Sequence, residues 1–234
     1  MAERVKPKRR YESPRRREQA QATRLEILEA AQRLFERDGY AATTMAAVAA
    51  EARVALKTVY IAFETKSGLL RALWNLRLRG GQGAVPVAQQ DWYRAVLEEP
   101  DPERQLRMNA HNSAHGKVRI GGLLEVIRSA APTDPDIAAL WNRINTDYHA
   151  NQGAIVESID DKRALNTSLD VAQATDILWT LNHPNTWQLL VTQRGWTAEQ
   201  YERWTGDLAV DRLLGDPTCR GQATQRVRRR SSTR

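Results

Sequence analysis

The 234-residue chain contains a single cysteine, Cys219, and only two phenylalanines. One cysteine excludes a disulfide within the chain. No apolar run is long enough to cross a bilayer as a helix, so the sequence predicts no transmembrane segment. The N-terminus is charged and no apolar stretch follows it, which argues against a secretory signal. We therefore expect a cytoplasmic protein that has no membrane partner.

Sequence motifs of catalysis are also missing. The chain has no G-x-S-x-G elbow, no P-loop, no dinucleotide-binding glycine fingerprint and no Cys–His pair at a useful spacing. His111 and His115 are four residues apart and would share one face of a helix, but no acid lies between them and the sequence indicates no third ligand nearby. We therefore predict a protein that is not an enzyme and that holds no metal ion and no cofactor.

The sequence lacks strands as well. No segment alternates apolar and polar residues over a useful length, so we expect an all-α fold. A glycine-rich break near residues 79–83 separates a small N-terminal part from a larger C-terminal part. The helices expected in the larger part span residues 91–99, 102–115, 117–131, 134–159, 170–193 and 197–214.

The most informative segment is residues 44–63, TMAAVAAEARVALKTVYIAF. Its apolar side chains recur at helical spacing in two short stripes, Met45, Val48, Ala49 and Ala52 in the first and Leu56, Val59, Tyr60 and Phe63 in the second. Thr44 precedes the first stripe and can cap that helix, and Arg53 breaks the pattern between the stripes. Lys57 and Thr58 lie off the second stripe, where they are suited to contact phosphates and base edges. The segment predicts a helix-turn-helix.

The flanking segments predict two more helices. Residues 20–38 place five apolar side chains on one face, namely Ile27, Leu28, Ala31, Leu34 and Phe35. Gly39 follows at a position that favours a left-handed C-cap. Thr65 is a candidate N-cap for a helix that carries Leu69, Leu70, Leu73 and Leu76. Together these helices are enough for a three-helix DNA-binding core and a connecting helix.

In this region the chain resembles the N-terminal domain of the TetR family of bacterial transcriptional repressors. The matching positions run without a gap over residues 24–70, and they are Ile27, Leu28, Ala31, Leu34, Phe35, Gly39, Tyr40, Thr43, Thr44, Val48, Ala49, Ala52, Val54, Thr58, Val59, Tyr60, Phe63, Lys66, Leu69 and Leu70. Three positions depart from the family pattern. Arg53 replaces a turn glycine and has to adopt a conformation that glycine reaches more easily. Ala55 cannot cap the second helix with a hydroxyl, and Ala62 cannot make the phosphate contact of a larger side chain.

The resemblance implies a DNA-binding role for six residues. Thr43, Thr44, Tyr60 and Lys66 are expected to touch phosphate, and Lys57 and Thr58 are expected to read base edges. A lysine can donate to the O6 and N7 atoms of guanine. Each of these residues could instead be a solvated surface side chain or, for Tyr60, part of the core.

The charge distribution agrees with a DNA partner. Residues 1–19 carry eight Lys/Arg against three acids, residues 20–79 nine against six, residues 80–219 twelve against nineteen, and residues 220–234 six against none. A polyanion would be attracted to the ends of the chain and repelled by its middle. The predicted organisation is a disordered basic arm (1–19), a helix-turn-helix domain (20–79), a helical ligand-binding and dimerisation domain (80–215) and a basic disordered tail (216–234). The arm could lie along DNA or simply solubilise the protein.

The last two long helices carry more apolar surface than a lone hairpin needs. By the resemblance, this pair forms a four-helix interface with a second copy of the chain. We predict a homodimer whose interface includes Leu178, Leu181, Leu189, Trp204, Leu208 and Leu213. Two recognition helices about 34–36 Å apart would read a two-fold symmetric site. The alternative is that these residues pack the core of one subunit.

The remaining helices are expected to enclose a ligand pocket. Aromatic side chains with a few polar groups suit a small apolar or aromatic effector. The candidate lining residues are Trp92, His111, Asn112, His115, Trp141, Tyr148, Trp179, His183 and Trp187. Aromatic residues also fill cores, which is the more common outcome for any one of them.

The sequence therefore predicts a ligand-responsive transcriptional regulator, a repressor that binds a palindromic operator on double-stranded DNA as a homodimer and is released by a small molecule. Two other classes remain open. One is a sequence-neutral architectural DNA-binding protein that uses its basic ends. The other is an all-helical small-molecule-binding protein or enzyme with a vestigial N-terminal domain. The specific pattern over residues 43–70 argues against the first, and the missing catalytic residues argue against the second.

Overall fold

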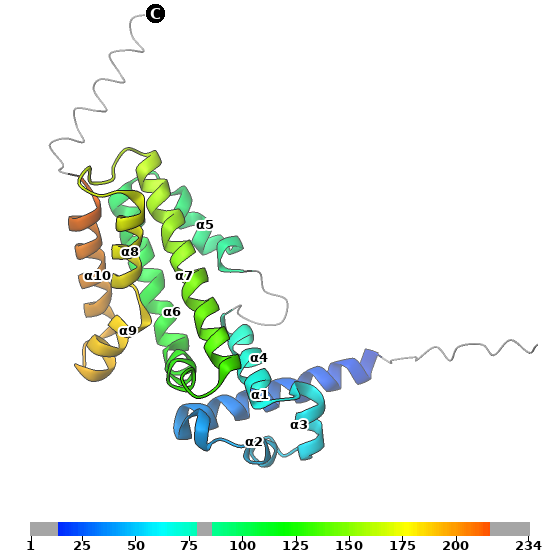
Figure 1. Ribbon diagram of the computed structural model, residues 1–234. Coiled ribbons are helices and arrows are strands. Elements are labelled where there is room, and N and C mark those ends of the chain that lie inside the picture. The colour runs from blue at the N-terminus through cyan, green and yellow to red at the C-terminus, as the bar shows by residue number, and fades with distance from the viewer. Residues whose placement is uncertain (1–13, 79–85, 216–234) are drawn as a thin grey trace, which may run out of the picture. The chain divides into compact units, whose positions relative to one another are not determined.

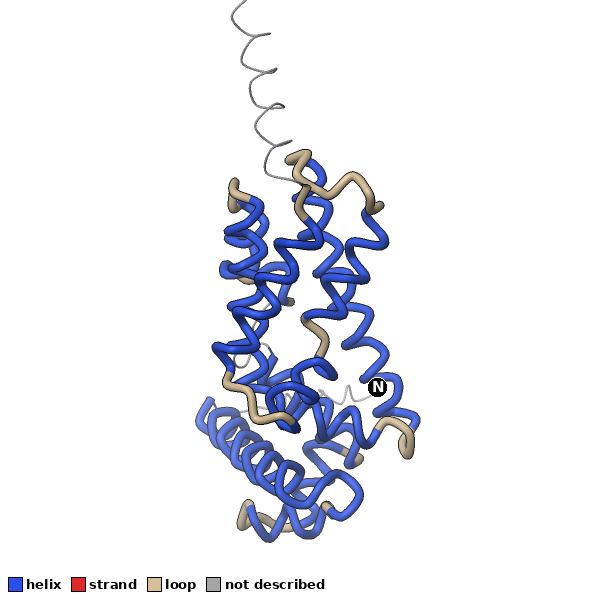
Figure 2. The backbone as a smooth tube through the Cα atoms, turned by 90° about the vertical axis from the view of Figure 1, so that its left-hand side faces the viewer, coloured by secondary structure: helices blue, strands red, loops and turns tan. Residues whose placement is uncertain are grey.

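The structure is a computed structural model of the chain, and it describes residues 14–78 and 86–215. All regular elements among these residues are helices, which confirms the expected fold class (Figure 2). The chain divides into two compact units, and the boundary falls between Trp74 and Asn75. None of the described helices is long and apolar enough to cross a membrane.

The first unit is built from α1 (Pro14–Ala42), α2 (Met45–Glu51), α3 (Leu56–Phe63) and the beginning of α4 (Lys66–Leu78) (Figure 1). The five side chains predicted for the inner face of the first helix are all buried, and so are Met45, Val48 and Ala49 of α2. From the second stripe of the helix-turn-helix, Val59 and Phe63 are buried, whereas Leu56 and Tyr60 are exposed. The apolar spacing therefore identified the buried faces, with two exceptions on α3.

Helix α1 begins at Pro14, so the prediction of a disordered arm reaching residue 19 is wrong for residues 14–19. Proline is tolerated in the first turn of a helix, and the Arg, Glu and Gln residues that follow are good helix formers that need no buried face. Residues 1–13 of the predicted arm and the predicted tail, 216–234, lie outside the described residues. At the other end of α1, Gly39 has a φ of 80°, in the left-handed region expected for it.

The turn between α2 and α3 is tight, as a helix-turn-helix requires. Arg53 has a φ of 55°, so this non-glycine residue does adopt the conformation that the sequence demanded of it. The N–H groups of Arg53 and Val54 donate to the carbonyl oxygens of Ala50 and Ala49 at 3.1 and 3.0 Å. Ala55 precedes α3 and makes no side-chain cap, also as expected.

The second unit contains α5 (Asp91–Glu98), α6 (Pro102–Ala130), α7 (Pro135–Asp161), α8 (Val171–Leu181), α9 (Pro184–Trp187) and α10 (Ala198–Leu213), with a short 3₁₀ turn at Val87–Gln89 and a π-helical turn at Gln188–Gln193. Helix α10 packs on α6 and α8, and α7 packs on α6 and α8 (Figures 1 and 2). Side-chain caps start five of these helices, and they come from Asp101, Asp134, Asp170, His183 and Thr197.

Two predicted helix boundaries in this unit are wrong. Residues 102–115 and 117–131 were expected as two helices, but α6 is continuous through Gly116 because Ala114 and Lys117 are buried on either side of it. Residues 170–193 were expected as one helix, but α8 ends at Leu181. Pro184 lacks the N–H that a continuing helix would need, so a new helix starts there.

The core of the second unit includes two residues that the sequence assigned to the dimer interface. Leu178 and Leu213 are fully buried within one subunit, together with Tyr93, Ile155 and other apolar side chains, so their assignment to an intersubunit face is corrected. Leu181 packs against the edge of the same core. Of the other three, Trp204 and Leu208 are half-buried and Leu189 is 54% exposed. Periodicity identified the apolar residues, but it did not show which of them are buried in the core of a single subunit.

Candidate nucleic-acid interface and ligand site

Helix α3 presents a continuous exposed face. Lys57 is exposed, Tyr60 is 48% exposed and Ile61 is 73% exposed. Residues at i, i+3 and i+4 are neighbours on a helix surface, so these three side chains lie on one side. Thr58 is half-buried beside them. The exposed face therefore offers an ammonium group, a phenol hydroxyl and an apolar side chain.

The buried side of α3 is held by both neighbouring helices. Arg24 of α1 donates from Nη1 to the carbonyl oxygen of Ala62 at 2.6 Å, and its guanidinium lies 4.1 Å from the centroid of the Phe63 ring. At the start of α4, Gly68 approaches the end of α3 so closely that a Cβ atom would lie 2.5 Å from the carbonyl oxygen of Phe63. These contacts fix the orientation of α3 without using any residue of its exposed face.

The two threonines before α2 have different positions. Thr44 is exposed, and its Oγ1 accepts a hydrogen bond from the N–H of Ala47 at 3.0 Å, which confirms the predicted cap. Its hydroxyl hydrogen remains able to reach a phosphate oxygen. Thr43 is only 2% exposed and donates from Oγ1 to the carbonyl oxygen of Gly39 at 2.8 Å. The expected phosphate contact of the Thr43 side chain is therefore corrected.

The ammonium group of Lys66 is hydrogen-bonded within the protein. Its Nζ donates to the carbonyl oxygens of Tyr40 at 2.8 Å and Thr43 at 3.1 Å, and it lies 4.3 Å from the centroid of the Tyr40 ring. Because a helix ending at Ala42 leaves carbonyl groups without helical partners, this ammonium group satisfies the end of α1. The sequence suggested a phosphate contact for Lys66; the geometry gives it the role of joining α4 to α1.

Arg53 is a basic residue near α3 that the sequence analysis treated only as a turn residue. It is exposed in the turn immediately before the helix. Its positive φ could be anticipated from the family pattern, whereas the exposure of its guanidinium group could not. It adds a second cation beside Lys57 to this part of the first unit.

The predicted pocket residues of the second unit do not form one group. Trp92 is exposed and donates from Nε1 to Oε1 of Gln90. His111 and His115 are also exposed. Their assignment to an enclosed pocket is corrected, because each lies on the outer side of its helix.

Five of the other six predicted pocket residues gather around α6, α7, α8 and α9, whereas Asn112 lies beside Met108 and His111. The ring of His183 lies 4.6 Å from that of Trp179 and 6.2 Å from that of Trp141, measured between centroids. Trp187 packs edge-on against Tyr201 of α10 at 5.0 Å. The structure thus brings together Trp141, Tyr148, Trp179, His183 and Trp187.

At the centre of this group lies Lys117, which the sequence analysis missed. It is 5% exposed, and its Nζ donates to Oγ of Ser113 and lies 5.3 Å from the centroid of the Tyr201 ring. Tyr148 donates its only hydroxyl hydrogen to the carbonyl oxygen of Asn182 at 2.8 Å, so Ser113 must donate to Tyr148 across their 3.0 Å contact. A hydrogen-bonded chain therefore runs from the ammonium group to the end of α8.

No carboxylate among the described residues forms an ion pair with Lys117. Burial lowers the pKa of its ammonium group to about 7. Burial, and secondly the positive charge of Lys117, lower the pKa of His183 to about 4. The same burial raises the pKa of Tyr148 and of Tyr201, so both phenols remain neutral.

Two further polar atoms near this cluster are buried without a hydrogen-bond partner, Nε1 of Trp179 and Oδ1 of Asn182. A cavity of about 10 Å³ adjoins Lys117, and its other lining residues are Gly121, Leu124, Glu125, Arg128, Pro184, Trp187 and Gln188. This volume holds about one water molecule. A larger ligand would therefore require movement of α9 or of side chains around it.

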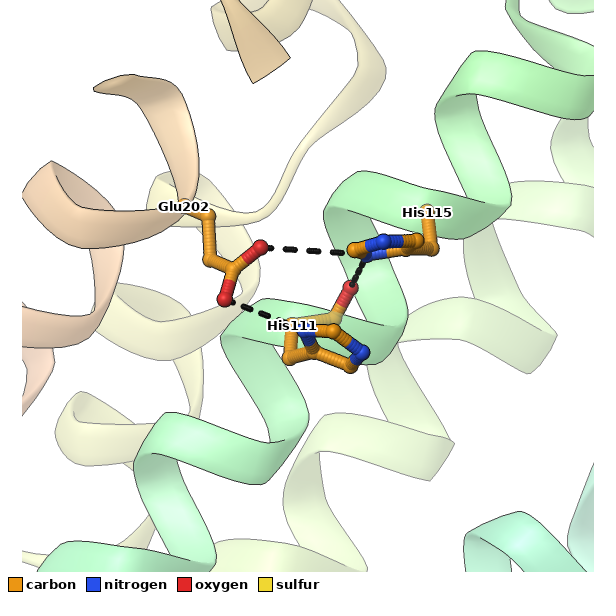
Figure 3. A group of neighbouring side chains, drawn as sticks. All are labelled: His111, His115 and Glu202. Atoms are coloured by element: carbon orange, nitrogen blue, oxygen red, sulfur yellow. Dashed lines mark hydrogen bonds and ion pairs between the residues drawn. The ribbon is translucent and has the colours of Figure 1, made fainter. Parts of the chain in front are cut away.

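The two exposed histidines have a third neighbour. Nδ1 of His111 lies 3.0 Å from Oε1 of Glu202, and Nδ1 of His115 lies 3.7 Å from Oε2 of the same carboxylate (Figure 3). Glu202 belongs to α10, and it is 91 residues from His111 in sequence. Sequence spacing alone could not identify it as a third potential ligand.

Comparison with known proteins finds one family profile that matches part of the first unit. Residues 27–73 match the profile of the bacterial regulatory proteins of the tetR family. No curated protein sequence matches the chain.

Solved structures share the fold over most of this chain. A TetR transcription regulator from Haloarcula marismortui is 19% identical, with a TM-score of 0.64 over 83% of this chain and 100% of that chain. NalD, the secondary repressor of the MexAB-OprM multidrug efflux pump in Pseudomonas aeruginosa, is 20% identical, with a TM-score of 0.66 over 85% and 99%. A transcriptional regulator from Saccharomonospora viridis in complex with choline is 15% identical, with a TM-score of 0.66 over 84% and 100%.

At these identities the likeness of the structures establishes the fold, and the match of residues 27–73 establishes the kind of N-terminal domain. The helix-turn-helix of α2 and α3, with its outward lysine and tyrosine, is the part of the molecule that this match covers. Residues 27–73 are thus similar to the N-terminal domain of the bacterial regulatory proteins of the tetR family, and the fold of the chain is similar to that of a solved TetR transcription regulator.

Proposed function

We propose that this protein is a transcriptional repressor that binds a palindromic operator as a homodimer and is released by a small molecule bound in its second unit. The observation that carries the proposal is the division of α3 into two faces. Val59 and Phe63 are buried, whereas Lys57, Tyr60 and Ile61 are exposed on one side. An amphipathic helix held in this way can enter the major groove.

On DNA, Lys57 reads base edges by donating to guanine O6 and N7. Thr58 contacts a neighbouring base edge, and the hydroxyls of Tyr60 and Thr44 bind phosphate oxygens. Arg53 adds charge to the same contact. Thr43 and Lys66 act indirectly, because their polar groups hold α1, α2 and α4 together.

Dimerisation uses the apolar surface that one subunit leaves exposed or half-buried on its last helices. The proposed interface residues are Leu181, Leu189, Trp204 and Leu208. The ring of Trp204 stands edge-on to that of Trp196 at 5.9 Å, which forms a rigid aromatic surface beside them. A two-fold axis through this surface would present two copies of α3 to the two halves of a palindrome.

The effector site is the cluster around Lys117. Its aromatic walls favour the aromatic or apolar ligand expected from the sequence, and the buried ammonium group favours a ligand that also carries an anionic group. Such a group would provide the charge partner that Lys117 lacks among the described residues, and it could accept a hydrogen bond from the unpartnered Nε1 of Trp179. A choline complex exists for the Saccharomonospora viridis regulator, so a solved protein of this fold accommodates a small molecule.

Release from DNA follows if the ligand binds the two arrangements of the dimer unequally. The coupling needed is about 1–3 kcal/mol or more, and it is reciprocal, so operator DNA would weaken ligand binding by the same factor. A cavity that must expand to admit a ligand is a suitable source of this difference, because filling it displaces the elements that line it.

Selection of bound fragments from a random double-stranded library tests the proposal. We expect enrichment of a two-fold symmetric sequence by the wild type and loss of preference at one or two base pairs per half-site in Lys57→Ala. Arg71→Ala, which removes an equal charge from the exposed surface of α4, is the control and should retain the preference. Binding without any enriched sequence would favour the architectural alternative and overturn the proposal.

A further inference from the structure

We propose that His111, His115 and Glu202 form a binding site for a divalent transition-metal ion, with Zn²⁺ as the best match, that joins α6 to α10. The site lies outside the cluster around Lys117 and outside the helix-turn-helix. It therefore adds a ligand of a different chemical class to those of the proposed function.

The three side chains already face one another. Each offers a ligand atom, and these atoms lie within 4.8 Å of one another. The two imidazole rings lie side by side with their centroids 3.9 Å apart, and the Glu202 carboxylate faces both of them (Figure 3). Ligand atoms around a tetrahedral zinc ion, each ~2.0–2.1 Å from the metal, are ~3.4 Å apart, so a contraction of up to about 1.4 Å is required. Both histidines are exposed, and rotation of their side chains can supply it.

The donor set suits zinc. Two imidazole nitrogens and one carboxylate oxygen are three ligands of the kinds that Zn²⁺ prefers, and water can fill the fourth position. The i, i+4 spacing on α6 keeps both rings on one side of a rigid helix. In addition, Nδ1 of His115 donates to the backbone carbonyl of His111 at 3.0 Å. A hydrogen bond of this kind fixes the tautomer, so the free lone pair of His115 is on Nε2, and rotation of the exposed ring would bring that atom to the metal.

The carboxylate is available for a cation. No lysine or arginine among the described residues forms an ion pair with Glu202, and both of its contacts are to the two imidazoles. Arg107, one helical turn before His111, pairs instead with Glu103 and with Asp207. A metal ion would replace the shared proton between His111 and Glu202 and would interact with all three groups at once.

His149 provides an internal comparison. It also pairs with a carboxylate on a neighbouring helix, with Nε2 lying 2.8 Å from Oδ1 of Asp176. It has no second imidazole beside it, and its neighbouring ring is that of Trp179. Two ligands bind zinc more weakly than three, so His149 should contribute nothing to a specific site.

A bound ion would hold the first turns of α10 on α6. Glu202 lies one residue after Tyr201, whose hydroxyl donates to the carbonyl oxygen of Leu181, and two residues before Trp204 of the proposed dimer surface. A ligand that binds the folded chain and not the unfolded one raises its stability. The metal should therefore raise the melting temperature and slow the opening of α10.

Calorimetric titration of zinc chloride into the untagged, chelator-treated full chain tests the site. We expect one ion per chain for the wild type, and at least tenfold weaker binding for His111→Ala and for Glu202→Gln, which keeps the size of the side chain. His149→Ala is the matched control and should bind within about twofold of the wild type. Thermal melts with and without zinc should show a metal-dependent rise for the wild type and the control only.

A cobalt titration gives a spectroscopic check, since a four-coordinate site produces visible absorption that the two ligand variants should lose. The inference is overturned if His111→Ala binds zinc as the wild type does, or if His149→Ala loses as much affinity as Glu202→Gln. Melts without metal separate these outcomes from misfolding, because Glu202→Gln retains an acceptor for the histidines. None of these measurements involves DNA, so they do not depend on the proposed repressor function.

Discussion

Replacing Lys117 with methionine should stabilise the second unit. The side chain is 5% exposed and has no carboxylate partner among the described residues, so its positive charge is desolvated without a compensating ion pair. Methionine has a similar length and no charge. Ser113 keeps its contact with Tyr148 in the variant, so the substitution leaves no new polar group without a partner.

The size of the effect follows from the pKa. In the folded chain the pKa of Lys117 is about 7, compared with 10.5 for a free lysine. Because one pKa unit is worth about 1.36 kcal/mol, keeping this lysine charged in the folded state costs ~5 kcal/mol. The full cost applies below pH 7, where Lys117 is protonated in both the folded and the unfolded chain. At pH 9 the folded state is neutral and the cost falls to ~2 kcal/mol, since only the unfolded state still binds the proton.

The sign of the pH dependence is therefore fixed. Between pH 7 and 10.5 the unfolded chain binds more protons at this site than the folded chain, so the free energy of unfolding rises with pH in the wild type. The variant lacks this contribution. Its advantage over the wild type should shrink by ~3 kcal/mol between pH 6 and pH 9.

Urea unfolding followed by tryptophan fluorescence measures this, because six of the seven tryptophans lie after residue 75. Lys162→Met is the control: its ammonium group is half-buried and already donates to Gln105 and Ser158, so a smaller change is expected. The reasoning is refuted if Lys117→Met is no more stable than the wild type at pH 6, or if its advantage is equal at pH 6 and pH 9.

Three further predictions concern other positions. Lys66→Ala should lower the stability of the first unit by about 1.5–3 kcal/mol, because the hydrogen bonds of Lys66 to the carbonyl groups of Tyr40 and Thr43 are charge-assisted. An unchanged melting temperature would mean that these bonds contribute nothing. Arg53→Gly should raise the stability of that unit by about 0.5–1 kcal/mol in denaturant unfolding, because the strain relieved at a φ of 55° exceeds the entropy that glycine adds to the unfolded chain; a loss would contradict the strain argument. Leu189→Lys changes an exposed side chain, so it should leave the fold intact while converting the proposed dimer to monomers in sedimentation, and a dimer that persists would exclude this surface.

The helix-turn-helix was predictable because its constraints are local. Apolar spacing over residues 44–63 located both helices. The turn position at which the family has glycine, Arg53, has a positive φ, and Thr44 caps α2 as its position suggested. Each of these features depends on residues within one or two helical turns. Sequence patterns record such short-range relations directly.

The features that escaped prediction depend on residues far apart in the chain. Lys66 binds carbonyl groups 23 and 26 residues away, and Glu202 meets a histidine 91 residues away. Lys117 looked like an ordinary charged position, and only tertiary packing makes it buried. Leu178 and Leu213 carried the right apolar signal, but periodicity does not distinguish a subunit core from an interface between subunits.

The contacts that hold α3 in place lie away from its exposed face. Arg24 and Gly68 secure the helix through its backbone and the Phe63 ring, so none of the exposed positions 57, 60 and 61 carries its packing. Under the proposed function, substitutions there would alter which duplex the protein prefers at little cost in folding free energy. Target preference and structural integrity would then be separate properties of this domain, and a new binding sequence could be selected without rebuilding the scaffold.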